Sequence, residues 1–323
     1  METIVLTQED VKKLITMRDA IDAVEEAFRL YALGKAQMPP KIYLTFDSGD
    51  LRAMPAHLMG YAGIKWVNSH PENPKKGLPT VMAVLILNDP KTGFPLAIMD
   101  ATYITSLRTG AASGVASKYL ARKNSKIFGF VGCGAQAYYQ FMALKEIFEI
   151  ESALAYDIDE KAARKFAKFC NNHGVDCRID RIERVCDCDV LTTATPSTKP
   201  VVMNDWIRNG THINAIGADA AGKQELDEKI LLRSKIVVDD LKQAMHGGEI
   251  NVAVSKGLID ESKIHATLGE VVAGIKSGRE SDDEVTVFDS TGLAIQDIAT
   301  AKVVYERAVE ENVGMKLKFF EIF

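Results

Sequence analysis

Phe128-Gly-Phe-Val-Gly132-Cys-Gly134-Ala-Gln-Ala137 joins an apolar run to a helix-forming segment through two closely spaced glycines. The apolar residues 126–131 predict a buried strand, and residues 135–148 predict the helix that follows. Gly132 permits a tight turn, Gly134 lets the backbone approach a ligand, and small Ala137 lets the helix pack against the strand. Free N–H groups at the start of such a helix favour anions, so the segment indicates a site for a dinucleotide pyrophosphate.

A glycine-rich turn between any strand and helix would show the same spacing, so the residues that follow matter. A second apolar run, residues 153–156, ends at Asp157, about 25 residues after the glycines, where a carboxylate can accept hydrogen bonds from the adenosine ribose. Asp159 adds a second negative charge, unless it serves only as a helix cap. Neither Lys nor Arg stands between these two acids to receive a 2′-phosphate, so the sequence predicts NAD rather than NADP.

The composition indicates a two-domain enzyme without a polyanionic partner. The 323 residues include 39 Lys and Arg against 44 Asp and Glu, with no basic block, so neither nucleic acid nor a membrane surface is an expected partner. No apolar run reaches the roughly 18 residues that a bilayer span needs, and the N-terminal residues lack a signal-peptide pattern. We therefore expect a cytoplasmic protein.

The cysteines do not indicate a metal site. There are five, they are irregularly spaced, and no His pair accompanies the Cys186-Asp-Cys188 triplet. We interpret them as small buried or half-buried thiols in a reducing compartment, and we expect no bound metal.

Residues 1–118 predict a domain with a largely antiparallel sheet. Thr7-Gln-Glu-Asp10 is typical of a capping box, and residues 19–32 have helical spacing. Short β-rich runs separated by turn residues then follow at residues 41–46, 51–54, 63–68, 80–88 and 94–99. A long helical segment, residues 104–120, leads toward the glycine-rich turn.

Residues 119–302 predict a doubly wound (Rossmann) parallel sheet, because strands and helices alternate along this part of the chain. The expected strands are residues 126–131, 153–156, 176–178, 190–194, 212–216, 236–239 and 285–288. The fold class is therefore α/β: an α+β catalytic and dimerisation domain followed by a nucleotide domain. We expect a final helix at residues 293–310, after the sheet, and we expect the C-terminal helical part from about residue 303 to 323 to return to the first domain.

Three ionisable residues lie among small or apolar neighbours. Burial of Lys65 within its strand-like run would lower its pKa toward a range useful for proton transfer, although a lysine there can also point to solvent. Asp219 follows a predicted strand whose end opens on the ligand crevice, although an Asp there can be a turn or cap residue. Arg108 in a helix can equally be a surface residue or a salt-bridge partner.

The chain resembles the ornithine cyclodeaminase and mu-crystallin family over nearly its whole length. The motifs that carry the resemblance are Lys65-Trp-Val-Asn-Ser-His-Pro71, Gly77-Leu-Pro-Thr80, Thr92-Gly-Phe-Pro-Leu96, Thr105-Ser-Leu-Arg108-Thr-Gly-Ala111, Gly132-Cys-Gly-Ala-Gln136 and Phe288-Asp-Ser-Thr-Gly292. The resemblance implies a homodimer, with Lys65 as the central proton-transfer residue, Asp219 as its polar partner near nicotinamide and substrate, and Arg108 as an anion anchor.

Two departures from the cyclodeaminase pattern concern the substrate. Arg52 stands where cyclodeaminases carry a Glu that holds the side-chain ammonium of ornithine, and Lys41 aligns with their carboxylate-binding Arg. An Arg would repel that ammonium but is well shaped to grip a small carboxylate. Arg52 could instead be a surface residue of a short strand.

Within the family the chain is most similar to the archaeal alanine dehydrogenases. This implies NAD-dependent, reversible oxidative deamination of alanine to pyruvate and ammonia, with a small amino acid or keto acid as substrate. An ornithine cyclodeaminase or ketimine reductase is the alternative, and a non-catalytic, crystallin-like nucleotide-binding protein is a second one. Besides Arg108 and Asp219, the residues expected to contact the cofactor are Gly132, Gly134, Ala135, Gln136, Asp157, Ile158, Asp159, Thr195, Gly217, Lys223 and Ser290.

Overall fold

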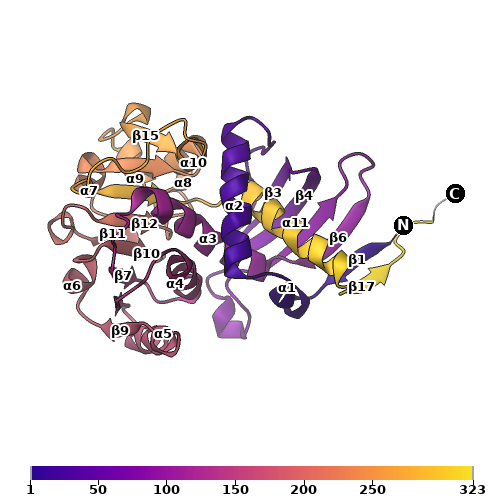
Figure 1. The fold of residues 1–323 in the computed structure, drawn as a ribbon, viewed down its shortest axis with the longest axis horizontal. Helices are drawn as coiled ribbons and strands as arrows, with labels where there is room; N and C mark the ends of the chain where they lie inside the picture. The colour runs from indigo at the N-terminus through magenta and orange to yellow at the C-terminus, as the bar shows by residue number, and fades with distance from the viewer. Residues whose placement is uncertain (1, 322–323) are drawn as a thin grey trace. The chain divides into compact units, whose positions relative to one another are not determined.

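The chain folds into two units, and the second interrupts the first in the sequence (Figure 1). The computed structural model describes residues 2–321. Unit 1 contains the residues up to Arg108 and those from Leu293 onward, and unit 2 is Thr109–Gly292. The first boundary falls inside the continuous helix α3 (Thr102–Leu120) rather than after residue 118. The second precedes α11 (Ala294–Glu310), so all of this helix belongs to unit 1, and not only its residues after 302.

Unit 1 is built on a seven-stranded sheet in the order β17-β1-β6-β5-β4-β3-β2. Its antiparallel meander confirms the expected sheet and consists of β2 (Ile42–Phe46), β3 (Gly49–Leu58), β4 (Tyr61–Ser69), β5 (Ala83–Asn88) and β6 (Pro95–Asp100). Two strands were not predicted: β1 (Thr3–Leu6), parallel to β6, and β17 (Met315–Leu317), antiparallel to β1.

Helices cover one face of this sheet. Capping boxes at Thr7 and Thr16 start α1 (Gln8–Leu14) and α2 (Met17–Ala32). The buried stripe of α2, which includes Ile21, Val24 and Phe28, packs with α11, and α11 in turn contacts β3, β4 and β5. Figure 1 shows α11, in yellow, crossing the strands of unit 1.

The strand register decides which side chains meet α11. Lys65 in β4 lies opposite Met54 in β3 and Leu85 in β5, so these three side chains share the helix-covered face. Their neighbours Trp66 and Val84 point to the other face and are exposed. The sheet therefore has one buried face and one apolar face open to the surroundings of this chain.

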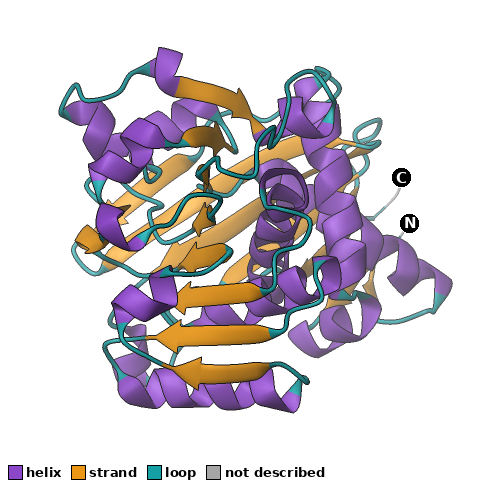
Figure 2. Cartoon of the chain, turned by 60° about the vertical axis from the view of Figure 1, so that its left-hand side comes forward, coloured by secondary structure: helices purple, strands orange, loops and turns teal. Residues whose placement is uncertain are grey.

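Unit 2 contains an eight-stranded, all-parallel sheet in the order β15-β14-β16-β12-β10-β7-β8-β9, which confirms the doubly wound prediction. The strands, drawn in orange in Figure 2, are β7 (Ile127–Val131), β8 (Ser152–Tyr156), β9 (Asp176–Ile179), β10 (Val190–Thr193), β12 (His212–Ala215), β14 (Lys235–Val238), β15 (Ile264–Thr267) and β16 (Thr286–Asp289). The chain order reverses between β7 and β10, which is where such sheets bind ligands.

The remaining elements of unit 2 flank this sheet. The longer helices are α4 (Ala135–Ile147) and α5 (Glu160–Asn172), which contribute Phe141 and Phe166 to a core cluster with Phe128 and Phe130 of β7. Short helices that were not predicted are α6 (Ile182–Cys186), α7 (Glu228–Arg233), α8 (Leu241–Gly247), α9 (Asn251–Ser255) and α10 (Leu268–Val272). A small parallel pair, β11 (Thr198–Val202) and β13 (Gln224–Leu226), was not predicted either. Single 3₁₀ turns occur at Asn204–Trp206 and Glu261–Lys263 in unit 2 and at Asn73–Lys76 in unit 1.

All five cysteines are free and buried, which confirms their interpretation as buried thiols. Burial raises the pKa of the Cys133 thiol to about 12, so it stays protonated at neutral pH. Among residues 2–321, no helix combines the length and apolar character needed to cross a membrane.

Candidate active site

Lys65 is completely buried in unit 1 and does not point to solvent. Its Nζ lies 2.9 Å from Oδ1 of Asp297, which α11 carries across the sheet. Burial is the main cause that lowers the pKa of Lys65 to about 7, and the positive charges of Arg108 and Lys41 act in the same direction. The carboxylate of Asp297 acts against this shift, and a neutral amine is accessible near neutral pH.

Asp297 is shared between two cations. Its Oδ1 also accepts a hydrogen bond from Nε of Arg108 at 3.1 Å, and Nη1 of Arg108 donates to Oε1 of Gln296 at 2.8 Å. Arg108 is therefore a salt-bridge partner within unit 1, as its alternative interpretation proposed. Asp297 Oδ2 and Gln296 Nε2 are buried and have no hydrogen-bond partner among the described residues. Polar atoms left in this state beside a buried lysine indicate a site built for a polar ligand.

Sequence reasoning missed Asp297 and Gln296. In the structure the first turn of α11, Ala294–Ile298, is completely buried, and these two residues are its polar members. Polar side chains on a buried turn need partners, and here the partners come from distant parts of the chain, so no local sequence signal marked the pair.

Arg52 lies on the same face of the sheet as Lys65. Arg52 is opposite Val67, which is two residues after Lys65 in β4, and side chains two residues apart in a strand share a face. Its guanidinium contacts the carboxylate of Asp50 through Nε at 2.7 Å and Nη2 at 3.0 Å, and it lies 5.5 Å from the ring centroid of Tyr43. The side chain is only 12% exposed, so Arg52 is not a surface residue of its strand. Unit 1 thus gathers cationic side chains on the face that carries Lys65.

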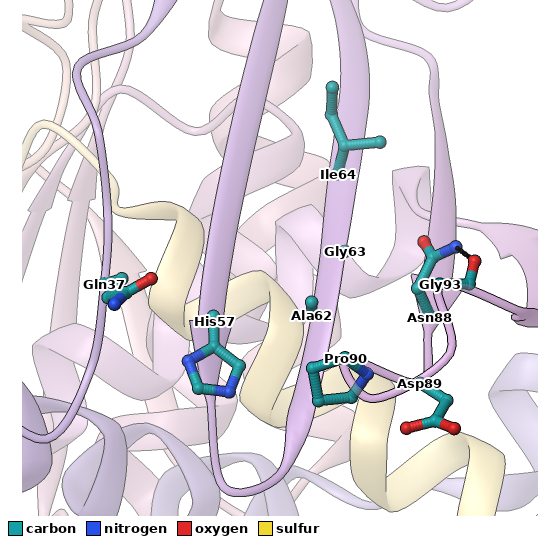
Figure 3. Close-up of a pocket in the computed structure, with 9 residues that line it drawn as sticks. All are labelled: Gln37, His57, Ala62, Gly63, Ile64, Asn88, Asp89, Pro90 and Gly93. Atoms are coloured by element: carbon teal, nitrogen blue, oxygen red, sulfur yellow. Dashed lines mark hydrogen bonds between the residues drawn. The ribbon is translucent and has the colours of Figure 1, made fainter.

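A hollow of about 560 Å³ in unit 1 contains none of the predicted residues (Figure 3). His57, Ile64, Asn88 and Asp89 are among the residues that line it. Ile64 directly precedes Lys65 in β4, and successive side chains of a strand point to opposite faces. The hollow is therefore not part of the lysine site.

The glycine-rich turn of unit 2 leaves room for a phosphate. Gly132 has φ +90°, and a Cβ there would lie 2.7 Å from the carbonyl oxygen of Ala194, so only glycine fits. Gly134 caps the N-terminus of α4, and a Cβ built on it meets no atom within 4 Å. This open, exposed space at the start of a 13-residue helix fits a dinucleotide pyrophosphate.

Asp157 holds this turn in place. Its carboxylate accepts hydrogen bonds from the N–H of Cys133 at 2.7 Å and from the N–H of Asp159 at 2.8 Å. The side chain of Asp159 caps α5 by accepting the N–H of Lys161, which agrees with its alternative interpretation. Between the two acids, Ile158 is 95% exposed. Contact of Asp157 with a ribose stays a prediction.

The other expected cofactor residues of unit 2 follow β10, β12 and β16. Asp219 forms an ion pair with Lys223 at 2.5 Å. Ser290 is buried, and its hydroxyl has no hydrogen-bond partner among residues 2–321. Thr195 and Gly217 both donate their N–H groups to the buried acid Glu225. Sequence reasoning missed Glu225, because an acid that closely follows a glycine, here Gly222, is usually exposed. The predicted residues thus form two sets, one in each unit.

The chain matches the model of the ornithine cyclodeaminase/mu-crystallin family over residues 1–312. It is 68% identical to the alanine dehydrogenase of Archaeoglobus fulgidus over 322 residues, covering 100% of both chains. A solved archaeal alanine dehydrogenase dimer with bound NAD matches with a TM-score of 0.98 and 68% identity, over 99% of this chain and 100% of the other. The Delta(1)-pyrroline-2-carboxylate reductase of Thermococcus litoralis, solved with NADH and L-proline, matches with a TM-score of 0.94 and 44% identity, over 97% and 99% of the two chains.

Proposed function

Because the chain belongs to the ornithine cyclodeaminase/mu-crystallin family, we propose that it is an NAD-dependent alanine dehydrogenase. The reaction converts alanine, NAD and water reversibly to pyruvate, ammonium, NADH and one proton. The observation that carries this function is the 68% identity to an alanine dehydrogenase along the entire chain, together with the TM-score of 0.98 to a solved NAD-bound relative.

The residues of unit 2 fit NAD. The N-terminus of α4 and the space at Gly134 would hold the pyrophosphate, and Asp157 would face the adenosine ribose. Exposed Ile158 would cover an apolar surface of the adenine. When bound, NAD accepts the hydride that leaves the α-carbon of alanine.

Lys65 is the proton-transfer residue of this proposal. A lysine whose pKa is about 7 exchanges its proton readily at neutral pH, as a general acid–base requires. Its Nζ would take a proton from the substrate ammonium and release it to solvent before the hydride leaves. It would then move a proton from the attacking water to the departing nitrogen, and it would accept the remaining hydroxyl proton as the C–N bond breaks and the carbonyl of pyruvate forms. Asp297 keeps the amine oriented through the 2.9 Å contact. Asp219 is the second residue proposed to move protons.

The cationic side chains of unit 1 suit a carboxylate substrate. Arg52, with Lys41 or Arg108, would hold the carboxylate of alanine or pyruvate and so fix the position of the α-carbon. The positive charge of Arg52 disfavours the side-chain ammonium of ornithine.

The active form of the enzyme is a homodimer, as in the solved NAD-bound relative. The exposed apolar face of the unit 1 sheet, which includes Trp66, Val84 and Ile86, supplies the kind of surface that a stable dimer buries. The five free, buried thiols support a reducing, cytoplasmic location.

The proposed function is tested by following NADH absorbance with a panel of amino acids and, in reverse, with keto acids plus ammonia. We expect alanine and pyruvate to give the highest kcat/KM, with NAD strongly preferred to NADP. Equal kcat/KM with NADP would contradict the assignment of Asp157, and a panel without alanine turnover would contradict the proposed reaction.

A reductase of cyclic imino acids is the second candidate, because the Thermococcus litoralis relative is 44% identical and was solved with NADH and L-proline. Delta(1)-pyrroline-2-carboxylate in the same assay separates the two functions. A kcat/KM for this imine above that for pyruvate plus ammonia would favour the reductase. Ornithine turnover without net NADH would instead indicate a cyclodeaminase.

A further inference from the structure

Glu225 is a fully buried acid in β13 whose carboxylate accepts three hydrogen bonds. Its Oε1 accepts the N–H of Thr195 at 2.6 Å, and its Oε2 accepts the N–H of Gly217 at 2.8 Å and the hydroxyl of Thr193 at 2.7 Å. Thr195 follows β10 and Gly217 follows β12. One side chain therefore ties together the loops that leave two neighbouring strands.

The two loops touch each other at this point. A Cβ on Gly217 would lie 2.1 Å from the carbonyl oxygen of Thr195 and 2.6 Å from the carboxylate of Glu225, so there is no space for a side chain between them. Glu225 itself is held from behind, because Glu249 accepts the backbone N–H groups of Glu225 and Leu226 at 2.7 to 3.0 Å. Both the position of the carboxylate and the separation of the loops are thus fixed.

The place of these loops in the sheet connects them with the cofactor. In a doubly wound sheet, the first strand and its neighbours on one side bind one mononucleotide half, and the strands beyond the reversal bind the other. The turn after β7 and Asp157 after β8 belong to the adenosine half. The loops after β10 and β12 lie beyond the reversal, at the edge where the nicotinamide half would bind.

We propose that Glu225 is a positioning residue for the nicotinamide half of NAD. It acts by holding the Thr195 and Gly217 loops at a fixed separation, and it does not touch the adenosine half. The proposal rests on the proposed function only in taking NAD as the cofactor.

The substitution Glu225→Gln keeps the size of the side chain and breaks one of the two loop contacts. An amide NH₂ group cannot accept a hydrogen bond. If the NH₂ replaces Oε1, the Thr195 N–H loses its acceptor, and if it replaces Oε2, the Gly217 N–H does. Either orientation releases one backbone contact, while the buried volume is unchanged.

Binding of NADH is compared with binding of ADP, which contains only the adenosine half. We expect E225Q to raise the Kd of NADH at least tenfold, measured by fluorescence titration, and to leave the Kd of ADP, measured calorimetrically, within twofold. The KM for NAD should rise, while kcat at saturating NAD stays within about threefold. A folded E225Q variant with unchanged NADH affinity, or with NADH and ADP weakened equally, overturns the proposal.

Asp189→Asn is the matched control. Asp189 is also a buried acid whose carboxylate accepts two backbone N–H groups, those of Lys126 and Ile127 at 2.8 and 2.9 Å, but it precedes β10 instead of following it. We expect D189N to lower stability without changing the Kd of NADH more than twofold. Equal loss of NADH affinity in both variants would show a general effect of removing a buried acid, which overturns the proposal.

If E225Q does not fold, Glu225→Asp is measured in the same way, because the shorter carboxylate reaches one loop but not both. Normal NADH affinity in a folded E225D variant overturns the proposal. Failure of the proposed function is distinguishable, since it would appear as absent alanine turnover in the wild-type enzyme with NADH binding intact.

Discussion

Lys65, Arg108 and Asp297 form a buried group of two cationic side chains and one acid. With Lys65 protonated the group carries an excess positive charge, and with Lys65 neutral its charges balance. Because an uncompensated buried charge costs several kcal/mol, the group favours the neutral amine more than an isolated ion pair would. The structure therefore supplies a base without help from solvent.

Replacement of Lys65 tests its chemical role. Lys65→Ala should lower turnover by roughly 10²-fold or more, the usual contribution of a general acid–base. Lys65→Arg should not restore activity, because a guanidinium stays protonated near neutral pH. NADH affinity, measured by fluorescence titration, should change little in either variant, since Lys65 belongs to unit 1. An active, folded K65A enzyme would contradict the mechanism.

The pH dependence of turnover should follow the titration of Lys65. Its pKa of about 7 lies below the ordinary 10.5, so turnover in alanine oxidation should rise through pH 7 and then level. Asp297 raises this pKa, so Asp297→Asn should move the rise to lower pH in a pH–rate profile. Between pH 7 and 10.5 only the unfolded chain keeps this proton, so this group makes the free energy of unfolding increase with pH. A profile unmoved in a folded D297N variant would argue against Lys65 as the titrating group.

Arg52 should determine the preference for a small carboxylate. Arg52→Glu replaces attraction by repulsion and should raise the KM for alanine and pyruvate by about tenfold or more. Arg52→Gln, which removes the charge without reversing it, should give an intermediate KM in the same steady-state assay. Unchanged alanine kinetics in R52E would show that Arg52 does not contact the substrate.

The residues of the site differed in how far the sequence could indicate them. Lys65 stands out because a charged residue interrupts an apolar strand. Asp297 does not, because its partners Lys65 and Arg108 are far away in the chain, and spacing patterns report only on local neighbours. Glu225 was missed for the same reason, since its importance comes from loops that converge only in the folded sheet.

At the scale of elements, the turn between β7 and α4 contains two glycines with different roles: Gly132 should affect the stability of the fold, and Gly134 should affect cofactor binding. Gly132→Ala should cost about 1–3 kcal/mol of unfolding free energy, because φ is +90° and the new Cβ would meet Ala194. Gly134→Ala should leave the free energy of unfolding within about 0.5 kcal/mol but weaken NADH about tenfold or more, since its Cβ occupies the open phosphate space. Denaturant unfolding and NADH titration of both variants provide the measurements. Normal NADH affinity in G134A would exclude this space as the pyrophosphate site.

Long periodic elements were predicted well and short ones were not. The strand–turn–helix at β7 and α4 was evident, because apolar runs and glycines coincide there. Strand β1 has only four residues, and what stabilises it is pairing with β6 and β17, far along the chain. Helices α6 to α9 are seven residues or shorter, too short for a helical period to appear in the sequence.

At the scale of the whole molecule, the open apolar face of the unit 1 sheet should hold the dimer together. Val84→Lys places a charge at its exposed centre and should shift the particle mass in light scattering toward that of one 35.4 kDa chain. Leu258→Lys is the control, because Leu258 is similarly exposed but lies in unit 2. Dimers that persist in V84K, or dissociate equally in L258K, would place the interface elsewhere.

The interruption of unit 1 by unit 2 also sets an order during protein synthesis. The glycine-rich turn between β7 and α4, and Asp157 after β8, are made long before Asp297, and structure forms while the chain grows. A nascent chain can therefore form its pyrophosphate turn while Lys65 still lacks its counter-ion. The buried base comes into existence only with the final helix, so the growing polypeptide acquires the start of its cofactor site first and its chemistry last.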